Sequence, residues 1–344
     1  MCLTLGFATH AQKKKKKEKD KSAPAAVQSA DKKESLQPYE KVITSKAITD
    51  EGLFKVHKAD EKYYYEIPDS LFGRDMLMVT RISKTAQNIG YGGENVRNQV
   101  VKWQKRDKKV LLRIASYNNV ANDSLPVSIS VRNSNFEPIV QIFDIKTYGK
   151  DSSVVIDVTP LFTKDTPALG LNEERRKQYK VTALDEGRSF IEYLKSFPIN
   201  VEARNVLTYK ASEPPSNAST LSISLEINNS MVLLPKVPMK PRLHDQRVGF
   251  FSTSQVDYGL EEHKAATRTY IRRWRLEPKD MEAFRRGELV EPVKPIVFYI
   301  DPATPTKWVR YLKSGVEDWN KAFEAAGFRN AILAKDAPTP EEDP

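Results

Sequence analysis

Apolar and polar residues alternate along most of residues 54–234, and this two-residue period predicts a region dominated by β-strands. The predicted strands are short, rich in β-branched and aromatic residues, and separated by polar turns. They cover residues 54–59, 62–67, 76–82, 100–104, 110–114, 127–131, 139–143, 154–158, 201–209, 221–227 and 231–234. The pattern therefore predicts a fold that is mostly β.

Helical patterns interrupt this region in only a few places. Helices are expected at residues 172–177 and 189–195, and short turns at residues 68–73, 91–95 and 160–162. The glycine turn at 91–95 lacks the Gly-Lys-Ser/Thr ending of a phosphate loop, so it predicts no nucleotide site. The last two strands are expected to pair as a hairpin across the Asn-Asn-Ser segment at 228–230.

The sharpest pattern lies near the end of the sequence, where an apolar strand is followed at once by an amphipathic helix. Residues 296–300 form a β-branched and aromatic run between prolines, which predicts a buried strand. Thr304 is expected to cap a helix of about six turns, with Pro305 at its first position and Gly327 as its C-cap. One face of this helix carries apolar residues at steps of three and four, namely Trp308, Leu312, Val316, Trp319, Phe323 and Ala326. We expect this face to be buried against the strand.

The net charge of +10 does not predict a nucleic-acid-binding surface, because half of it lies in one short segment. Residues 12–35 hold nine lysines against four acidic residues, which leaves +5 for the other 320 residues. Such a segment buries too little apolar area to fold, so we expect a disordered linker there. Its role is either that of a solvated spacer or that of a peripheral contact with an anionic envelope surface.

A second basic group also contains an aromatic residue, as nucleic-acid-binding surfaces do. Its members are Arg268, Arg272, Arg273, Trp274 and Arg275. The group is a single cluster on one predicted strand, and stacking of arginine on tryptophan explains it equally well. We therefore expect no nucleic-acid partner.

The first eleven residues resemble the end of a secretory signal. Residues 3–8 form a short apolar run, and small residues at Thr9 and Ala11 fit a cleavage site after Ala11. We interpret residues 1–11 as a signal-peptide remnant and expect export to the periplasm, the outer membrane or the extracellular space. The alternative is a terminus without a targeting role. No run of about 18 apolar residues is present, so no transmembrane segment is expected.

Residues that could perform chemistry are sparse. Cys2 is the only cysteine, which excludes an internal disulfide and a cysteine-based zinc site. The sequence has no Gly-x-Ser-x-Gly motif, and no cysteine nucleophile remains after export. No two of its histidines are four residues apart, as a zinc protease helix requires; they are His10, His57, His244 and His263. We therefore predict no catalytic and no metal-binding residue within these 344 residues.

Two polar residues have alternative interpretations. His57 lies alone on a predicted strand, and we interpret it as structural. Asp301 ends the strand that precedes the C-terminal helix. A carboxylate at that place could be a ligand or a switch in a cleft, but it more commonly satisfies a turn.

Four segments carry a resemblance to a known family. They are PMKPR at 238–242, DQRVGFF at 245–251, RWRL at 273–276, and FYIDPATPTKWVRYLKSGVEDWNKAFEAAGFRNAI from Phe298 onward. Together they resemble a bacterial (Bacteroidetes-type) family of zinc-dependent metalloproteases of the metzincin type, although Phe250 stands where tyrosine is common.

The resemblance implies an α+β fold with three parts. These are a small β-rich domain at residues 36–86, a large β-rich domain at 93–283, and the start of an α/β metzincin-like catalytic domain at 290–344. It also implies that the full-length protein binds zinc and a protein or peptide substrate. The motif H-E-x-x-H-x-x-G-x-x-H, which holds zinc in that family, is not among these residues.

Two hypotheses follow. In the first, this is the N-terminal portion of an exported zinc-dependent metalloprotease, inactive alone, in which a zinc-activated water hydrolyses peptide bonds in the full-length protein. The structural core of the catalytic domain's first helix is then Trp308, Leu312, Val316, Trp319 and Phe323. In the second, the chain is a non-catalytic exported β-rich binding or scaffold protein with a vestigial catalytic stub.

Overall fold

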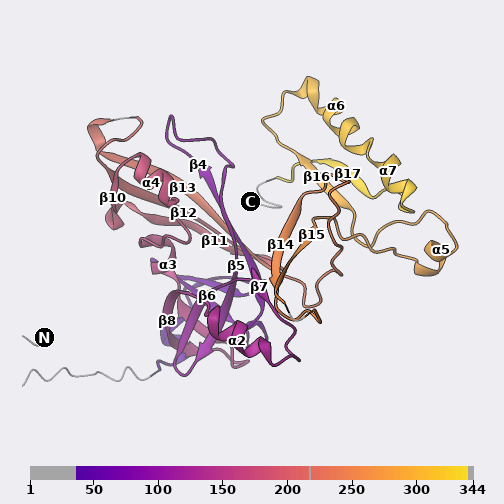
Figure 1. Ribbon diagram of the computed structural model, residues 1–344. Coiled ribbons are helices and arrows are strands. Elements are labelled where there is room, and N and C mark those ends of the chain that lie inside the picture. Colours follow the sequence, from indigo (N-terminus) through magenta and orange to yellow (C-terminus); the bar gives the residue numbers. More distant parts are fainter. Residues whose placement is uncertain (1–35, 217, 263, 340–344) are drawn as a thin grey trace, which may run out of the picture.

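The computed structural model describes residues 36–216, 218–262 and 264–339, and shows a β-rich protein with short helices (Figure 1). The strands form a large sheet, a three-stranded sheet and a two-stranded sheet. Within the described ranges no helix is both long and apolar enough to cross a membrane. The expected signal remnant and lysine-rich linker lie outside these ranges. The prediction of a mostly β fold is confirmed.

Twelve antiparallel strands form the large sheet. Along its main path they are β1 (Ile48–Asp50), β2 (Lys55–Ala59), β3 (Lys62–Ile67), β9 (Val154–Asp157), β8 (Ile139–Tyr148), β6 (Lys109–Ala115), β5 (Asn95–Arg106), β4 (Asp75–Lys84), β13 (Ser222–Leu233), β12 (Asn200–Ala211) and β10 (Val181–Leu184). The twelfth strand, β11 (Phe190–Ser196), also pairs with β12. Tight turns with positive φ at Asp60 and Asp107 close the β2–β3 and β5–β6 hairpins, as their polar sequences predict.

Hydrogen bonds join the two ends of the large sheet. The Leu53 N–H donates to the Phe197 carbonyl at 2.7 Å, and the Ser196 N–H donates to the Asp50 carboxylate at 2.8 Å. The Ser196 hydroxyl donates to the carbonyl of Phe54 at 2.7 Å. Because these bonds link the β1–β2 end with β11, the sheet is nearly closed around its core.

Large aromatic side chains fill the inside of this sheet. Trp103 is fully buried, and its ring centroid lies 6.3 Å from Phe54, 6.2 Å from Tyr65 and 5.6 Å from Phe143. The rings of Phe54 and Tyr65 meet that of Trp103 nearly edge-to-face, an arrangement that adds to the free energy of burial. Residues from the two ranges expected as separate domains, 36–86 and 93–283, therefore share one sheet and one core.

Short helices cover the sheet or its connections. They are α1 (Tyr39–Val42), η1 (Asp69–Leu71), α2 (Val127–Ser134), α3 (Thr159–Thr163), α4 (Glu173–Gln178), η2 (Glu186–Arg188) and η3 (Ala218–Thr220). The side-chain oxygen of Asn172 accepts the Arg175 N–H at 3.0 Å and so caps α4. The helix predicted at residues 172–177 is confirmed.

The strand predicted at residues 127–131 is wrong, because this segment belongs to α2. Pro126 has helical backbone angles, and the Ile129 N–H donates to its carbonyl at 3.1 Å. Arg132 then forms an ion pair with Asp123 at 2.7 Å, which ties the helix to the turn before it. A short Val-Ser-Ile-Ser-Val alternation does not distinguish a strand from a helix. Here the local contacts of Pro126 and Arg132 select the helix.

The helix predicted at residues 189–195 is also wrong, because this segment is β11. Its residues pair with β12 from Phe190 opposite Val206 to Ser196 opposite Val201. The pairing supplies partners that the isolated segment lacks, and its aromatic and β-branched side chains suit a strand.

The hairpin predicted across residues 228–230 is wrong as well, because β13 runs through them without a turn. Asn229 is buried there, and its side chain accepts a hydrogen bond from Thr80 at 2.7 Å and contacts Asn205 at 3.5 Å. Polar residues that signal a turn in sequence are instead satisfied by neighbouring strands.

Residues 281–336 form a separate C-terminal unit, drawn in yellow in Figure 1. Its elements are α5 (Met281–Arg285), β16 (Ile296–Ile300), α6 (Thr306–Glu317), α7 (Asn320–Ala325) and β17 (Ile332–Asp336). β16 and β17 pair in parallel, with the two helices between them in the chain, so the unit contains a β-α-β motif. The strand predicted at residues 296–300 is confirmed.

The single helix of about six turns predicted here is in fact two helices, α6 and α7. The Asn320 side chain accepts the Ala331 N–H at 3.0 Å and donates to the Ile332 carbonyl at 2.9 Å, which ties the start of α7 to β17. Pro305, not Thr304, occupies the N-cap of α6. Gly327 follows α7 with φ of 91°, as expected of a left-handed C-cap.

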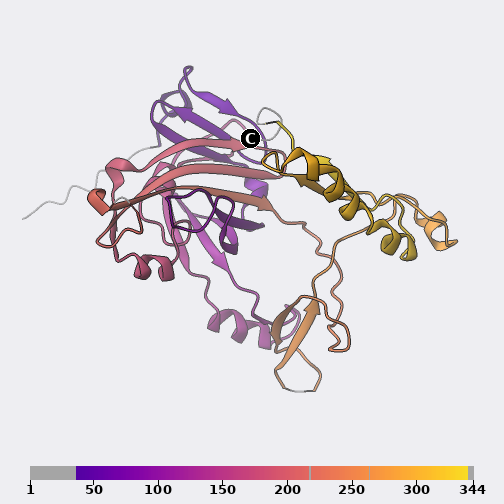
Figure 2. The ribbon, with the colours of Figure 1, turned by 90° about the horizontal axis from the view of Figure 1, so that it is seen from above.

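A three-stranded sheet combines two strands that follow the large sheet in the chain with one strand from the earlier connection between β6 and β8. It consists of β14 (Ser252–Asp257) between the antiparallel β15 (Ala266–Ile271) and the short parallel β7 (Asn119–Val120). Seen from above, the β14–β15 hairpin and the C-terminal unit project from the large sheet in different directions (Figure 2).

Candidate functional site

The described residues do not form the zinc site that the resemblance implies for a full-length relative. His57 lies on β2 in the large sheet, whereas His244 lies beside β15, where its N–H donates to the Thr269 carbonyl at 2.8 Å. Nowhere in the described ranges do three potential metal ligands come together. His10 and His263 lie outside these ranges. This part of the chain therefore does not fit a catalytic zinc ion.

His57 instead belongs to a buried polar network centred on Glu66. Its Nε2 lies 3.0 Å from a Glu66 carboxylate oxygen, and its Nδ1 lies 2.8 Å from the Thr49 hydroxyl. Tyr39 and Ser153 donate their hydroxyls to the same carboxylate at 2.8 and 2.6 Å. The network joins α1, β1, β2 and β3 under the first described residues of the chain.

The contacts around Glu66 also explain its ionisation. Burial by itself raises the pKa of the carboxyl, but hydrogen bonds from His57, Ser153 and Tyr39, together with the nearby Lys55, lower it to about 2. The same burial and the neighbouring carboxylate raise the pKa of Tyr39 above its usual range. Glu66 is thus a charged, fully bonded group, which agrees with a structural role for His57.

Asp301 closes a turn. Its carboxylate accepts the Ala303 N–H at 2.7 Å, and its carbonyl accepts the Thr304 N–H at 2.9 Å, just before α6 begins. The side chain is exposed, and no other potential metal ligand among the described residues gathers around it. Of its two interpretations, the structure supports the turn.

Three of the arginines near Trp274 contact separate local partners. Arg273 donates to the Lys240 carbonyl at 2.8 Å, Arg275 pairs with Glu277 at 2.7 Å, and Arg268 lies 3.8 Å from Glu262. Their positive ends are therefore directed to separate local partners. Trp274 itself packs on Phe298.

An apolar groove lies in the C-terminal unit between its helices and its two strands. It has a volume of about 550 Å³ and is lined by Trp274, Phe298, Tyr311, Leu312, Gly315, Val316, Trp319, Phe323 and Ile332. The rings of Trp274 and Phe298 meet edge-to-face at 6.3 Å on the strand side. We call this feature the apolar groove.

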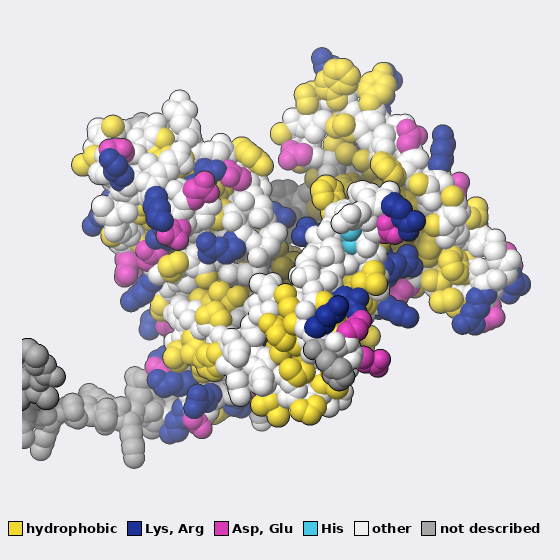
Figure 3. Space-filling model, viewed as in Figure 1, with side chains coloured by type: hydrophobic (Ala, Val, Ile, Leu, Met, Phe, Trp, Pro, Cys, Tyr) yellow, Lys and Arg dark blue, Asp and Glu magenta, His cyan; other side chains and the backbone are white. Residues whose placement is uncertain are grey.

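The apolar helix face that was expected to be buried is largely open. Trp308 is 52% exposed, Leu312 47% and Trp319 64%, whereas Val316 and Phe323 are half-buried. In this chain the prediction of a buried face is therefore wrong for Trp308, Leu312 and Trp319. The physical reason is that the sheet of this unit has only two strands, which are too few to cover the apolar side of two consecutive helices. Figure 3 shows hydrophobic side chains gathered on the surface of this unit, at the upper right.

The helix wall of the apolar groove follows from sequence periodicity, but its other wall does not. Phe298 and Ile332 face the groove from β16 and β17, and Trp274 reaches it from the segment after β15. The sequence groups Trp274 with the neighbouring arginines, and this grouping does not predict its contact with Phe298. Successive side chains of a strand point to opposite faces, so the strand predicted at residues 296–300 could have placed Phe298 on the same face as Ile296 and Ile300.

Comparison with protein families covers most of the described chain. Residues 93–279 match the family described as "Domain of unknown function (DUF5117)", which is 187 of 344 residues. The chain belongs to the DUF5117 family. Residues 36–85 match a second description, "Domain of unknown function (DUF5118)". A search of curated proteins and a search of solved structures each found no match.

The two matched segments interlock in space. The DUF5118 segment supplies α1 and β1 to β4, and the DUF5117 segment supplies β5 to β15. β3 pairs with β9 and β4 pairs with both β5 and β13, so three strand pairings join the segments in one sheet. The C-terminal unit lies outside both segments, and of the residues lining the apolar groove only Trp274 belongs to DUF5117.

Proposed function

We propose that this chain is the N-terminal part of an exported zinc-dependent metalloprotease, in which the large sheet supports the first β-α-β motif of a catalytic domain. The apolar groove is the observation that carries the proposal. A two-stranded unit leaves Trp308, Leu312 and Trp319 exposed, and a folded protein normally covers such a surface with another layer. Further strands and helices of an α/β catalytic domain are a layer of the required kind.

The sequence resemblance supports the same proposal independently. The string that begins at Phe298 coincides with the end of β16, both helices and the start of β17. The segments at 245–251 and 273–276 lie on either side of the β14–β15 hairpin. The resemblance thus extends over the three-stranded sheet and the C-terminal unit.

In this proposal the zinc ion binds outside the described residues, because they do not bring three metal ligands together. We assign them no step of peptide hydrolysis. Their role is to support the catalytic domain, which takes a protein or peptide as its substrate. The proposal includes export through residues 1–11, and it keeps both roles open for the lysine-rich residues 12–35, spacer or contact with an anionic envelope surface.

Reading the gene in frame past codon 344 tests the proposal. We expect the motif H-E-x-x-H-x-x-G-x-x-H within about 150 residues. The protein purified from its source should then exceed 39.1 kDa, contain zinc, and lose peptidase activity when the zinc is chelated. A stop codon directly after Pro344, or a continuation without the motif, overturns the proposal.

The second candidate function is that of a non-catalytic exported binding or scaffold protein. Exposed Trp308 and Trp319 favour it, because exposed aromatic residues are common anchors for protein partners. The same experiment separates the two functions. A stop codon supports binding, and the zinc motif supports the protease.

A further inference from the structure

The two strands of the C-terminal unit differ in what their outer edges contact. β16 and β17 pair in parallel with a continuous register along both strands. The Ile296 N–H donates to the Ala331 carbonyl at 2.8 Å, so the backbone of Ile296 faces β17. Because backbone groups alternate between the two edges of a strand, the N–H and C=O of Val297 and Tyr299 point to the outer edge of β16.

Side chains of the two helices occupy the outer edge of β17. The Asn320 side chain accepts the Ile332 N–H at 3.2 Å and donates to the Ile332 carbonyl at 2.9 Å. The Glu317 carboxylate accepts the Ala334 N–H at 3.3 Å. A further strand at this edge would have to displace these contacts, because each N–H already has an acceptor.

The outer edge of β16 has no such contacts. No residue that the structure describes forms a hydrogen bond with the N–H or C=O of Val297 or Tyr299. The edge is also accessible, because Phe298 is 44% exposed and Tyr299 is 56% exposed. Unpaired backbone groups on an exposed strand edge are a template for one more strand.

The side chains of the two strands agree with this difference. β16 has the sequence Ile-Val-Phe-Tyr-Ile, which contains no charged residue. A continuous apolar and aromatic run is typical of an inner strand that is covered on both faces. β17 ends with the exposed residues Lys335 and Asp336, and charged side chains are common on edge strands.

Phe298 places the apolar groove beside the free edge. Its side chain lines the groove together with Leu312 and Trp319 of the helix wall. A strand next to β16 brings every second side chain to the same face of the sheet, beside Phe298. Such a strand therefore supplies apolar side chains to the open side of the groove.

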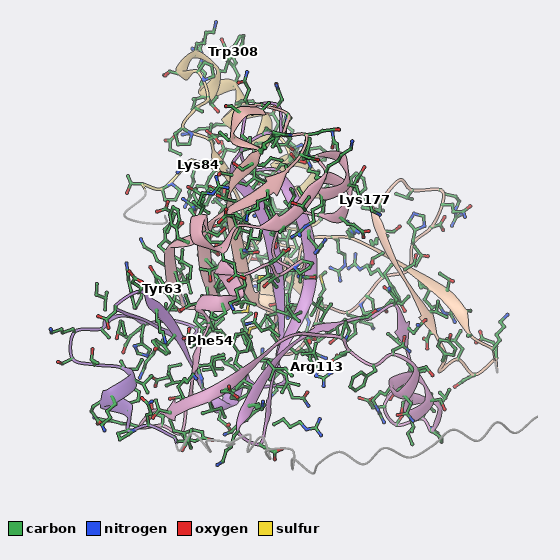
Figure 4. All side chains as sticks on the ribbon, turned by 90° about the vertical axis from the view of Figure 1, so that its left-hand side faces the viewer. Phe54, Tyr63, Lys84, Arg113, Lys177 and Trp308 are labelled. Carbon is green, nitrogen blue, oxygen red and sulfur yellow. The ribbon has the colours of Figure 1, made fainter. Side chains whose placement is uncertain are left out.

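The large sheet does not cover α6. Figure 4 shows Trp308, near the N-terminal end of α6, at the tip of the C-terminal unit and far from Phe54 in the core of the large sheet. A strand that covers the apolar groove therefore has to come from outside the described residues.

We propose that the next strand of the catalytic domain pairs with β16 and not with β17, so that β16 becomes an inner strand and β17 remains an outer strand. The occupant is a segment of this same protein that follows residue 344. Its backbone bonds to Val297 and Tyr299, and apolar residues at every second position cover Leu312 and Trp319. This inference rests on the proposed function, because it requires a catalytic domain that extends the two-stranded sheet.

Amide hydrogen exchange tests which edge is used. In the 344-residue chain the Val297 and Tyr299 amides should exchange rapidly, because they have no acceptor among the described residues. In the longer protein purified from its source both should slow at least about a hundredfold, whereas the Ala334 amide should keep its rate. A slowed Ala334 amide beside rapidly exchanging Val297 and Tyr299 amides overturns the inference.

Proline substitutions test the same edges by removing one N–H at a time. Tyr299→Pro should change the melting temperature of the C-terminal unit little in the 344-residue chain and lower it clearly in the longer protein. Ala334→Pro removes the N–H that is bonded to Glu317 and should have the same effect in both proteins. Tryptophan fluorescence follows this transition, since three of the four tryptophans lie in or beside the unit.

Tyr299→Ala is the matched control, because it removes the side chain and keeps the N–H. An equal effect of Tyr299→Pro in both proteins shows that the β16 edge stays unpaired and overturns the inference. If Tyr299→Pro does not fold, the exchange rates of the unsubstituted proteins decide.

The outcomes separate this inference from the proposed function. A longer protein that lacks the zinc motif but protects the Tyr299 amide overturns the proposed function and supports the strand order. A protein that contains the motif but gains protection at Ala334 overturns the strand order and leaves the proposed function standing. A stop codon directly after Pro344 overturns both.

A second copy of the chain is the competing occupant of the β16 edge. Sedimentation of the 344-residue chain distinguishes it. A dimer that dissociates in Tyr299→Pro, but not in Tyr299→Ala, assigns the edge to self-association and overturns the inference. A monomer in which the Val297 and Tyr299 amides exchange rapidly agrees with it.

Discussion

The large sheet and the C-terminal unit bury aromatic side chains to very different extents. In the large sheet Trp103 is fully buried among Phe54, Tyr65 and Phe143. In the C-terminal unit Trp319 is 64% exposed beside an open groove. Twelve strands curve far enough to enclose their own core, whereas two strands cannot cover two helices. An apolar face in a sequence thus marks what is to be buried, but not which part of the protein will bury it.

Removing the central aromatic residue of the large sheet should have the largest effect. Trp103→Ala is expected to lower the free energy of unfolding by about 3–5 kcal/mol, because it empties a fully buried site. Urea unfolding followed by circular dichroism measures this change. Trp308→Ala, at an exposed position, is the matched control. A loss below about 1 kcal/mol for Trp103→Ala would contradict the enclosed core.

Glu66→Gln should have the next largest effect and should change the pH dependence of stability. At neutral pH we expect a loss of about 1–3 kcal/mol, because buried hydrogen-bond partners lose a charged acceptor. The folded-state pKa of Glu66 is about 2, against 4.5 for the ordinary group. Its contribution is therefore fully present above pH 4.5 and is lost as pH falls towards 2.

Unfolding measured between neutral and acid pH checks this prediction. In Glu66→Gln the part of the acid destabilisation that belongs to this carboxyl should disappear, and Glu174→Gln on the surface of α4 is the control. If Glu66→Gln leaves the loss of stability at acid pH unchanged, the network does not hold an ionised carboxylate.

Gly327→Ala should weaken the C-terminal unit more than the large sheet. The residue has φ of 91°, and a Cβ there would lie 2.6 Å from the ring of Phe284, so we expect a loss of about 1–2 kcal/mol. Hydrogen exchange of α7 and β17 should increase while that of β12 stays the same. Gly315→Ala has open space and a helical backbone, and should stabilise α6 slightly. Faster exchange in both variants would contradict the strain argument.

Trp319→Ala should have the smallest effect in this chain, below about 1 kcal/mol, because the side chain is mostly in solvent already. If further elements of a catalytic domain cover the apolar groove, the same substitution in a longer protein should cost about 3–5 kcal/mol. Thermal unfolding of both proteins measures the difference. A large loss in the 344-residue chain would mean that the groove is closed in solution.

Much of the fold could be predicted from sequence where local chemistry is unambiguous. The β2–β3 and β5–β6 hairpins, the Asn172 cap of α4 and the left-handed Gly327 all follow from turn and cap residues. The errors at residues 127–131, 189–195 and 228–230 have one cause. Short alternating or polar segments allow more than one structure, and their neighbours in space select it.

The candidate sites divide in the same way. The helix wall of the apolar groove, from Leu312 to Phe323, is visible as a period of three and four in the sequence. Its other wall is not, because Trp274, Phe298 and Ile332 come from three separate segments that meet only in the folded structure.

The sequence by itself determined which residues are apolar enough to be buried and where most strands and turns lie. It also determined that these residues contain a single cysteine, Cys2, and no zinc-protease histidine motif. Only the tertiary structure decided that residues 36–85 and 93–279 share one core, that the helix face of the C-terminal unit stays open, and that hydrogen bonds join the two ends of the large sheet. The physical reason is that periodicity is a local property of the chain. Burial and strand pairing depend on which distant segments are present to provide the other surface.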